Sequence, residues 1–337
     1  MTTRRKFLFS TAAFGAAMLV RPRETFTNTS SLSRTEPLLA QRRGETLITF
    51  LHTNDTHSQI DPVPPNDRLY PGKGGVARRA TLVRRIRRQN PNTLLIDAGD
   101  VFQGTPYFNF YRGEVEYKAM SAIGYDAGTL GNHEFDNGVD ALAAALKFAD
   151  FDLVSANYDV RGTPLESKVK RYVVRRVDGV KVGLFGLGIS PAGLITPANF
   201  KGVTYQDPVI AAREVVSILR EKERCNLVVG MSHLGYYPEP KQNEVGDSQV
   251  ASQVDGIDFI ASGHNHSFMA EPVSVRQPAG KETLIFQVGK SGIFVGRVDF
   301  KVRRGQVVAS AGRLLDLREV SGSEDKEVSS FRFHVSS

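Results

Sequence analysis

Apolar runs and amphipathic segments alternate through the first half of the chain after residue 44. Runs of apolar and β-branched residues predict four strands, of which the third is the weakest: Thr46–Leu51, Thr93–Ile96, Asp126–Leu130 and Leu153–Ala156. Apolar residues at helical spacing predict the helices between them: Val76–Gln89, Val115–Ile123 and Val139–Phe148. Strands that alternate with helices favour a parallel sheet, because each helix crosses over between two strands.

The second half of the chain has more predicted strands and fewer helices. Two apolar runs, Tyr172–Val177 and Val180–Leu187, flank the turn residues Asp178-Gly179 and predict a hairpin. One helix is expected at Pro208–Lys222, and further strands at Leu227–Met231, Phe259–Ala261, Leu284–Val288, Phe294–Val302 and Gln306–Ser310. We therefore predict an α/β fold in which two packed mixed sheets are flanked by helices, a four-layer α/β/β/α sandwich.

The first 43 residues differ in composition from the rest. Arg4-Arg5-Lys6 precedes an uncharged run of about 14 residues, from Phe7 to Val20, whereas a membrane span needs about 20. This pattern is typical of a twin-arginine export signal, and a membrane anchor is the alternative. We expect residues 1–43 to be an export signal and a flexible linker, and residues 44–337 to form one domain. The protein would then be periplasmic or extracellular, with no stable membrane span after processing.

The charge of the chain argues against a nucleic-acid partner. The formal net charge is +7, but residues 1–23 hold five basic residues and no acid, so about +2 remains without them. The arginine-rich segment 78–88 also carries apolar residues at helical spacing, as a helix with one solvated face does. Cys225 is the single cysteine, so no internal disulfide can form.

Metal-binding residue types follow five of the predicted strands. They lie in Asp55-Thr56-His57, Gly99-Asp100, Gly131-Asn132-His133-Glu134, Ser232-His233 and Gly263-His264-Asn265-His266. The carboxyl ends of parallel strands meet at one edge of a sheet, where ligands bind. Two carboxylates, one amide and five imidazoles gathered there are the ligand set of two divalent metals, and Zn, Mn, Fe and Co all fit it.

The order of these motifs resembles that of the calcineurin-like metallophosphoesterases. Within that family, His52-Thr53-Asn54-Asp55, Gly74-Gly75 and the segment from Gly131 to Asp136 resemble the 5′-nucleotidase branch. The resemblance covers nearly all of the chain after residue 44. It implies the same four-layer sandwich and identifies residues 44–337 as similar to the N-terminal catalytic domain alone.

The resemblance also implies a role for each site residue. One metal would be held by Asp55, His57 and His266, the second by Asn132, His233 and His264, with Asp100 bridging the two. His133 would be the catalytic histidine, oriented by Asp136. These roles agree with the chemistry, because two ions about 3.5–4 Å apart can generate hydroxide near neutral pH. A protonated histidine beside them can stabilise the transition state or protonate the leaving oxygen. His52 precedes the ligand loop and is predicted to be structural.

The sequence thus predicts an exported two-metal phosphoester hydrolase that acts on nucleotides in the manner of a 5′-nucleotidase. The alternatives are a related hydrolase of 2′,3′-cyclic nucleotide diesters, nucleotide sugars or sulfur-linked groups, and a non-catalytic, metal-dependent nucleotide-binding subunit. The aromatic residues that follow Asp100 form either a packed loop or a wall near the metals: Phe102, Tyr107, Phe108, Phe110 and Tyr111.

Relatives in this branch usually carry a second domain that grips the base between aromatic rings. Only about 70 residues follow His266, and the predicted strands use most of them. A further domain of about 100 residues does not fit. We therefore expect either a separately encoded nucleotide-recognition partner or a broad phosphoesterase with weak base preference.

Overall fold

The computed structural model of the chain describes residues 36–238 and 245–317. The predicted export signal, most of the linker and residues 318–337 lie outside these ranges. Within them, no helix has the length and apolar character needed to cross a membrane.

The first sheet has seven strands in the order β15-β14-β1-β2-β3-β4-β6. Their bounds are β1 (Glu45–Thr53), β2 (Thr93–Asp97), β3 (Ala127–Gly128), β4 (Asp152–Val154), β6 (Val169–Lys170), β14 (Phe294–Arg303) and β15 (Gln306–Asp316). Neighbouring strands from β1 to β6 are parallel, as the alternation of strands and helices predicts. β14 pairs antiparallel with β1 and with β15, so the sheet is mixed.

The second sheet has six strands in the order β12-β13-β11-β10-β8-β7. Their bounds are β7 (Tyr172–Val177), β8 (Val180–Gly188), β10 (Leu227–His233), β11 (Phe259–Ser262), β12 (Val273–Arg276) and β13 (Glu282–Phe286). The four inner strands are parallel, and β7 and β12 are antiparallel edges. A separate short pair joins β5 (Tyr158–Asp159) to β9 (Thr204–Tyr205).

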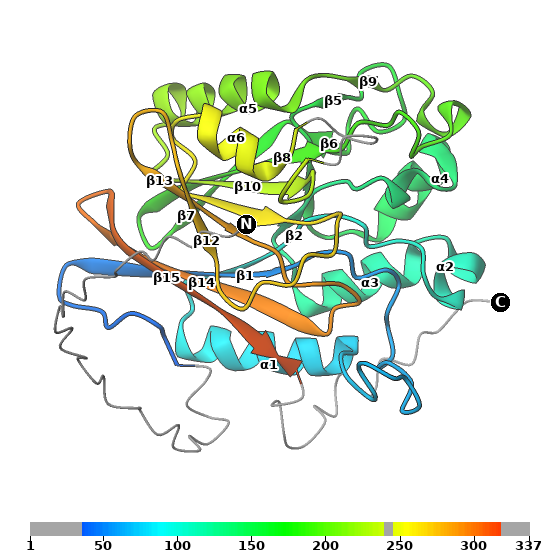
Figure 1. Cartoon of the computed structure of the whole chain (residues 1–337), viewed down its shortest axis with the longest axis horizontal. Coiled ribbons are helices and arrows are strands. Elements are labelled where there is room, and N and C mark those ends of the chain that lie inside the picture. Colours follow the sequence, from blue (N-terminus) through cyan, green and yellow to red (C-terminus); the bar gives the residue numbers. More distant parts are fainter. Residues whose placement is uncertain (1–35, 239–244, 318–337) are drawn as a thin grey trace, which may run out of the picture.

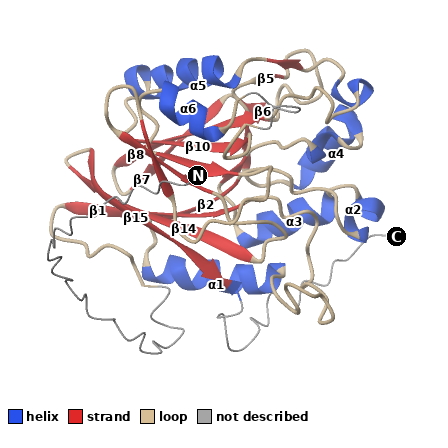
Figure 2. Ribbon diagram, viewed as in Figure 1, coloured by secondary structure: helices blue, strands red, loops and turns tan. Residues whose placement is uncertain are grey.

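Helices cover the outer faces of both sheets (Figures 1 and 2). α1 (Val76–Gln89), α3 (Glu114–Ile123) and α4 (Gly138–Ala145) pack on the first sheet, and α5 (Pro208–Ser217) and α6 (Asp247–Gln253) on the second. Alternate residues of one strand serve different layers: Leu94 and Ile96 face the other sheet, whereas Leu95 faces the helices. The predicted four-layer sandwich is thus confirmed.

Several predicted bounds are wrong, and two helices, α2 (Pro106–Tyr111) and α6, were not predicted. The strand expected at Asp126–Leu130 is only β3, and β15 continues to Asp316 because it pairs with β14 throughout. The last turns of two predicted helices tighten or widen into η3 (Leu146–Phe148), a 3₁₀ turn, and η5 (Ile218–Lys222), a π-helix. α2 is too short for its aromatic residues to show a period.

His52 lies in the core between the sheets, consistent with its predicted structural role. Its ring packs edge-on against Phe259 and Phe286, with centroids 5.6 and 5.1 Å away. Burial lowers the pKa of His52 to about 3, so the ring is neutral there.

Candidate metal centre

The ligand loops begin where strands of both sheets end, at one edge of the sandwich. β1 leads to Asp55 and His57, β2 leads to Asp100, and β10 ends at His233. The loop after β11 carries His264 and His266. The packing of the two sheets therefore joins loops that are far apart in the sequence.

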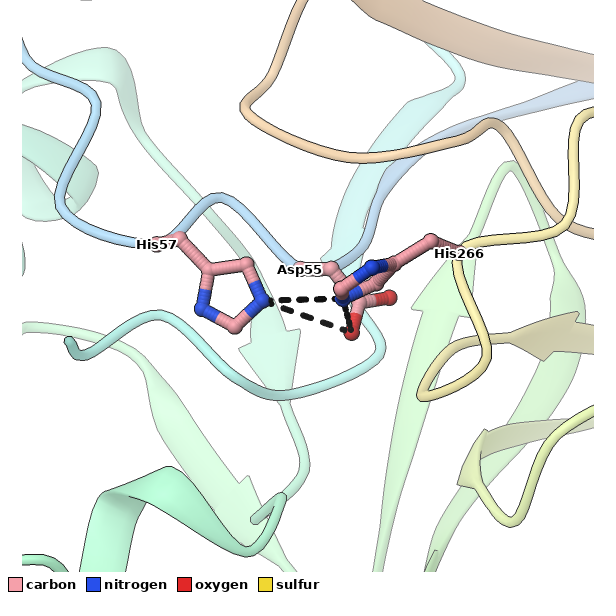
Figure 3. A group of neighbouring side chains, drawn as sticks. All are labelled: Asp55, His57 and His266. Carbon is pink, nitrogen blue, oxygen red and sulfur yellow. Dashed lines mark hydrogen bonds and ion pairs between the residues drawn. The ribbon is translucent and has the colours of Figure 1, made fainter. Parts of the chain in front are cut away.

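Asp55, His57 and His266 form the first cluster, with one ligand atom of each lying within 4.8 Å of the others. The Nε2 atoms of His57 and His266 are 3.0 Å apart, and Asp55 Oδ1 lies 3.4 Å from His266 Nε2. Figure 3 shows the three side chains converging from two separate loops. His57 Nδ1 lies 3.2 Å from the Phe102 carbonyl, so a proton on Nδ1 leaves Nε2 free to bind metal.

Asp100, His233 and His264 form the second cluster by the same criterion. Asp100 Oδ2 lies 3.0 Å from His233 Nε2, while His233 Nδ1 lies 2.8 Å from the Ala98 carbonyl and can donate to it. Burial lowers the pKa of His264 to about 4, which favours the neutral imidazole that binds metals. The two clusters adjoin, since His233 Nε2 is also 3.9 Å from Asp55 Oδ1.

Asn132, the predicted amide ligand, lies beside the second cluster. A Cβ added to Gly131 would lie 2.8 Å from His233 Nε2, so only glycine lets the loop approach so closely. Asn132 is 7% exposed, and its Oδ1 is buried without a hydrogen-bond partner. A buried acceptor without a donor is costly, and a cation would satisfy it. The donor set and this oxygen therefore fit two divalent metals.

Five of the predicted ligands have left-handed backbones that few non-glycine residues adopt: Asp55 (φ 49°), His57 (47°), Asp100 (53°), His264 (84°) and His266 (52°). This backbone turns the side chains toward one another at the end of each strand. Such strain persists only where the surroundings hold it, and it is concentrated at functional sites.

His133 and Asp136 lie next to the clusters. The rings of His133 and His57 have centroids 5.5 Å apart, and His133 Nδ1 lies 2.9 Å from Asp136 Oδ2. Burial lowers the pKa of His133, but the bond to Asp136 and the nearby Asp100 carboxylate outweigh it and raise the pKa to about 9. The imidazole is therefore protonated at neutral pH.

Glu134 is a functional residue to which sequence reasoning assigned no role. Its buried carboxylate accepts the backbone N–H groups of Gly131 (2.6 Å), Asp100 (3.0 Å) and Val101 (2.7 Å). One side chain thus joins the loop after β2 to the loop after β3. The available signal was its place in the motif Gly131-Asn132-His133-Glu134, two residues after a predicted ligand.

Asn54 has a comparable role beside Asp55. Its amide donates to Asp55 Oδ2 and to the Gly289 carbonyl, both at 2.6 Å, and its Oδ1 accepts the Val288 N–H. The backbone N–H of His264 donates to both Asp55 oxygens, at 3.1 and 3.0 Å. Groups from both sheets therefore fix the orientation of the Asp55 carboxylate.

Comparison with known proteins gives a consistent result. The calcineurin-like phosphoesterase family model matches residues 48–268. A 5′-nucleotidase of Bos taurus is 34% identical over 79% of this chain and 48% of its own length. The trifunctional nucleotide phosphoesterase YfkN of Bacillus subtilis is 32% identical over 75% of this chain and 18% of its own. A 5′-nucleotidase precursor from Thermus thermophilus, a solved structure, superposes with a TM-score of 0.73 at 34% identity, covering 84% of this chain and 57% of that one.

The chain spans about half the length of most curated relatives it matches, and less of YfkN. The family match nevertheless extends over most of the described fold and includes every ligand loop. The chain belongs to the calcineurin-like phosphoesterase family, and its relatives include 5′-nucleotidases.

Proposed function

We propose that this protein is an exported, two-metal phosphoester hydrolase that acts on nucleotides as a 5′-nucleotidase does. The observation that carries the proposal is the pair of ligand clusters at one sheet edge, with the hydrogen-bonded pair His133 and Asp136 beside them. The names of the relatives, which include 5′-nucleotidases and a nucleotide phosphoesterase, support nucleotides as the substrate class.

The residues divide into metal ligands and a proton donor. Asp55, His57 and His266 would hold one ion, Asn132, His233 and His264 would hold the other, and Asp100, which lies with the second cluster, would be shared between them. Zn, Mn, Fe and Co all suit these ligands. When bound, such a pair supplies hydroxide near neutral pH and offsets phosphate charge.

His133 handles the proton at the leaving oxygen. Asp136 accepts from Nδ1 at 2.9 Å, which directs the Nε2–H of the imidazolium away from Asp136. With a pKa of about 9, His133 carries its proton at neutral pH and can donate it to a departing alkoxide.

The aromatic cluster after Asp100 is partly core and partly surface. Phe102 and Phe108 are buried and stack on each other, so they form a packed loop. The remaining aromatic residues line an open groove of about 620 Å³: Tyr107, Phe110 and Tyr111. Gly104 also lines it and lies against His57, where an added Cβ would be 2.8 Å from the carbonyl oxygen. This groove would accept an aromatic part of the leaving group, such as the base of a departing nucleoside, beside the first cluster.

Base preference is expected to be weak in the chain alone. Stacking on an aromatic face is tolerant of sequence, because every base has such a face. Stronger discrimination would need hydrogen bonds to the base, which a separately encoded recognition partner would supply.

Substrate profiling of the metal-loaded protein tests the function. We expect hydrolysis of adenosine, guanosine and uridine monophosphates with rates that differ less than ~100-fold. A 2′,3′-cyclic nucleotide, a nucleotide sugar, a thiosulfonate ester and an aryl phosphate test the alternative hydrolases. Binding of nucleotides without turnover, under several divalent metals, would support the non-catalytic subunit instead.

Export is tested separately by cell fractionation. The natural chain should be found outside the cytoplasm, and a variant with Arg4→Lys and Arg5→Lys should stay inside. Equal export of both chains would exclude the twin-arginine route.

A further inference from the structure

A small cavity lies beneath the loop that carries His57. It is lined by residues of the segment Thr56–Ile60, by Val101, by α1 and by α3, and its volume is about 10 Å³. A single water molecule needs roughly 10–15 Å³. Most of the lining is apolar, but Arg79 from α1 and Glu116 from α3 also face it, and each is 2% exposed.

Both charged groups have unused hydrogen-bonding atoms. Nε and Nη2 of Arg79 and Oε2 of Glu116 are buried without a hydrogen-bond partner. The other atoms are satisfied: Arg79 Nη1 donates to the Tyr125 hydroxyl at 3.1 Å, and the Ser58 hydroxyl donates to Glu116 Oε1. Unpaired buried charge is strongly unfavourable, so a partner is needed at this place.

We propose that the cavity holds one water molecule that bridges Arg79 and Glu116. A guanidinium only donates and a carboxylate only accepts, whereas water does both. The water would accept from Arg79 and donate to Glu116 Oε2. The facing groups have opposite charges, which favours a neutral occupant over an ion. The result is a water-mediated ion pair between α1 and α3.

This pair is connected to the strands that precede the metal ligands. The Tyr125 hydroxyl lies 2.8 Å from the Thr53 hydroxyl, which donates to Asp97 Oδ2 at 2.5 Å. Asp97 Oδ1 in turn accepts the N–H of Gly99 at 2.9 Å, directly before Asp100. A buried polar network therefore runs from Arg79 to the last residues of β1 and β2.

Arg79 also supports the loop that contacts Asp55 from the other side. A Cβ on Gly292 would collide with the guanidinium, so this loop lies directly on Arg79. The neighbouring Ser291 N–H donates to the Asp55 carbonyl at 2.7 Å. Arg79 is thus a positioning residue: it lies against the loop at Gly292 and is linked by hydrogen bonds through Tyr125 to the ends of β1 and β2.

The water itself is tested by a high-resolution crystal structure of the natural chain. We expect one ordered water within hydrogen-bonding distance of both Arg79 and Glu116. An empty cavity, or a direct bond between the two side chains, would overturn the proposal.

The positioning role is tested by metal affinity. Arg79→Met keeps the aliphatic stem but removes the donors, and we expect Zn²⁺ and Mn²⁺ affinities, measured by chelator competition, to fall about tenfold, as for lost outer-shell partners. The matched control is Arg87→Met on the same helix, because Arg87 pairs with Asp126 at 2.8 Å, away from the ligand loops. This control should lose stability but keep metal affinity within about twofold of the natural chain. Equal affinities in the two variants would contradict the role.

A double variant covers the case in which Arg79→Met folds poorly. Groups joined through one water are coupled, so Arg79→Met with Glu116→Leu should destabilise the fold less than the two single changes added together. Additive effects on the free energy of unfolding would show that no bridge couples them. If Glu116→Leu is insoluble, Glu116→Gln, which keeps the side-chain size, replaces it both alone and together with Arg79→Met.

Discussion

Left-handed backbone occurs at both ends of the sandwich, but for different reasons. At the turn between β7 and β8, Asp178 (φ 47°) and Gly179 (φ 80°) are exposed and simply reverse the chain. At the metal edge, Asp55 (φ 49°) and His57 (φ 47°) have nearly the same φ values, but Asp55 is fully buried and His57 is mostly buried.

The difference lies in what holds the conformation. The backbone of the turn needs only local chemistry, since Asp and Gly tolerate this region and water solvates it, although the Asp178 side chain also accepts from the Thr46 hydroxyl at 3.2 Å. The metal edge needs long-range hydrogen bonds, such as those from Asn54 and His264 to Asp55. Strain at the turn is thus intrinsic to its residues, while strain at the site depends on the whole fold.

The largest effect that would test this comparison is expected from Asp100→Asn. Loss of the bridging charge should weaken both metals and nearly abolish turnover, because cation–cation repulsion is no longer offset. Mass spectrometry measures the metal content, and an activity assay measures turnover. Asp178→Asn is a control that should change neither quantity. If Asp100→Asn keeps two metals and a near-native rate, the bridging assignment is wrong.

His133→Ala is expected to lower turnover by roughly 10²–10⁴, the range for a lost general acid or electrostatic stabiliser. Metal content should stay the same, because His133 is not a predicted ligand. Loss of metal would instead make His133 a ligand.

Asp136→Asn should also lower turnover, but by less than His133→Ala. The pH dependence of its turnover shows whether Asp136 acts through His133. Burial lowers the pKa of His133, but the bond to Asp136, together with the nearby Asp100 carboxylate, outweighs burial and raises the pKa to about 9. The active protonated form is therefore present below that pH and is lost as pH rises through it. Without the carboxylate, the alkaline limb of kcat should move to lower pH. An unmoved limb would show that another group titrates.

Glu134→Gln should weaken metal binding about 10–100-fold, the usual cost of losing an outer-shell partner. The new amide group would face N–H donors that now point at a carboxylate oxygen. Asp126→Asn is the matched control, because Asp126 also accepts a backbone N–H of β2, that of Leu95 at 2.7 Å, but away from the ligand loops. That control should lower thermal stability without changing metal affinity. Similar metal loss in both variants would make Glu134 merely structural.

Phe110→Ala should have a smaller effect that is limited to substrates with a ring. Phe110 is 78% exposed, so its removal costs the fold little, but a lost stacking contact should raise KM for adenosine monophosphate about tenfold. Glycerol phosphate, which has no ring, is the control substrate. A similar change for both would exclude the groove as a base-binding surface.

The smallest effect is expected at the turn. Gly179→Ala places a Cβ at φ 80° and should destabilise the fold by about 1 kcal/mol, because L residues disfavour this region. Denaturant unfolding measures this loss, and turnover at 25 °C should not change. A loss of activity would mean that the two ends of the sandwich are coupled.

The sequence determined the fold class because its hydrophobic pattern is strong. The apolar runs of the strands and the 3.6-residue period of α1 predict buried sheets covered by amphipathic helices. The Asp178-Gly179 hairpin was predictable because its chemistry is local. α2 could not be predicted, since it is too short for its apolar residues to show a helical period. The true length of β15 could not be predicted either, since it depends on pairing with β14.

The ligand types were likewise visible in the sequence, because metals require a few residue types and strands deliver them at their ends. The supporting roles of Glu134, Asn54 and Arg79 were not visible in the sequence. Such a role for a buried acid, amide or guanidinium is recognised only from the groups that surround it. Hydrogen bonds between residues far apart in the chain decide their roles. The sequence therefore predicted the architecture, which the structure confirms, and a candidate ligand set. The tertiary structure alone decided which buried polar groups hold those ligands in place, because burial makes each such group costly unless the fold provides its partner.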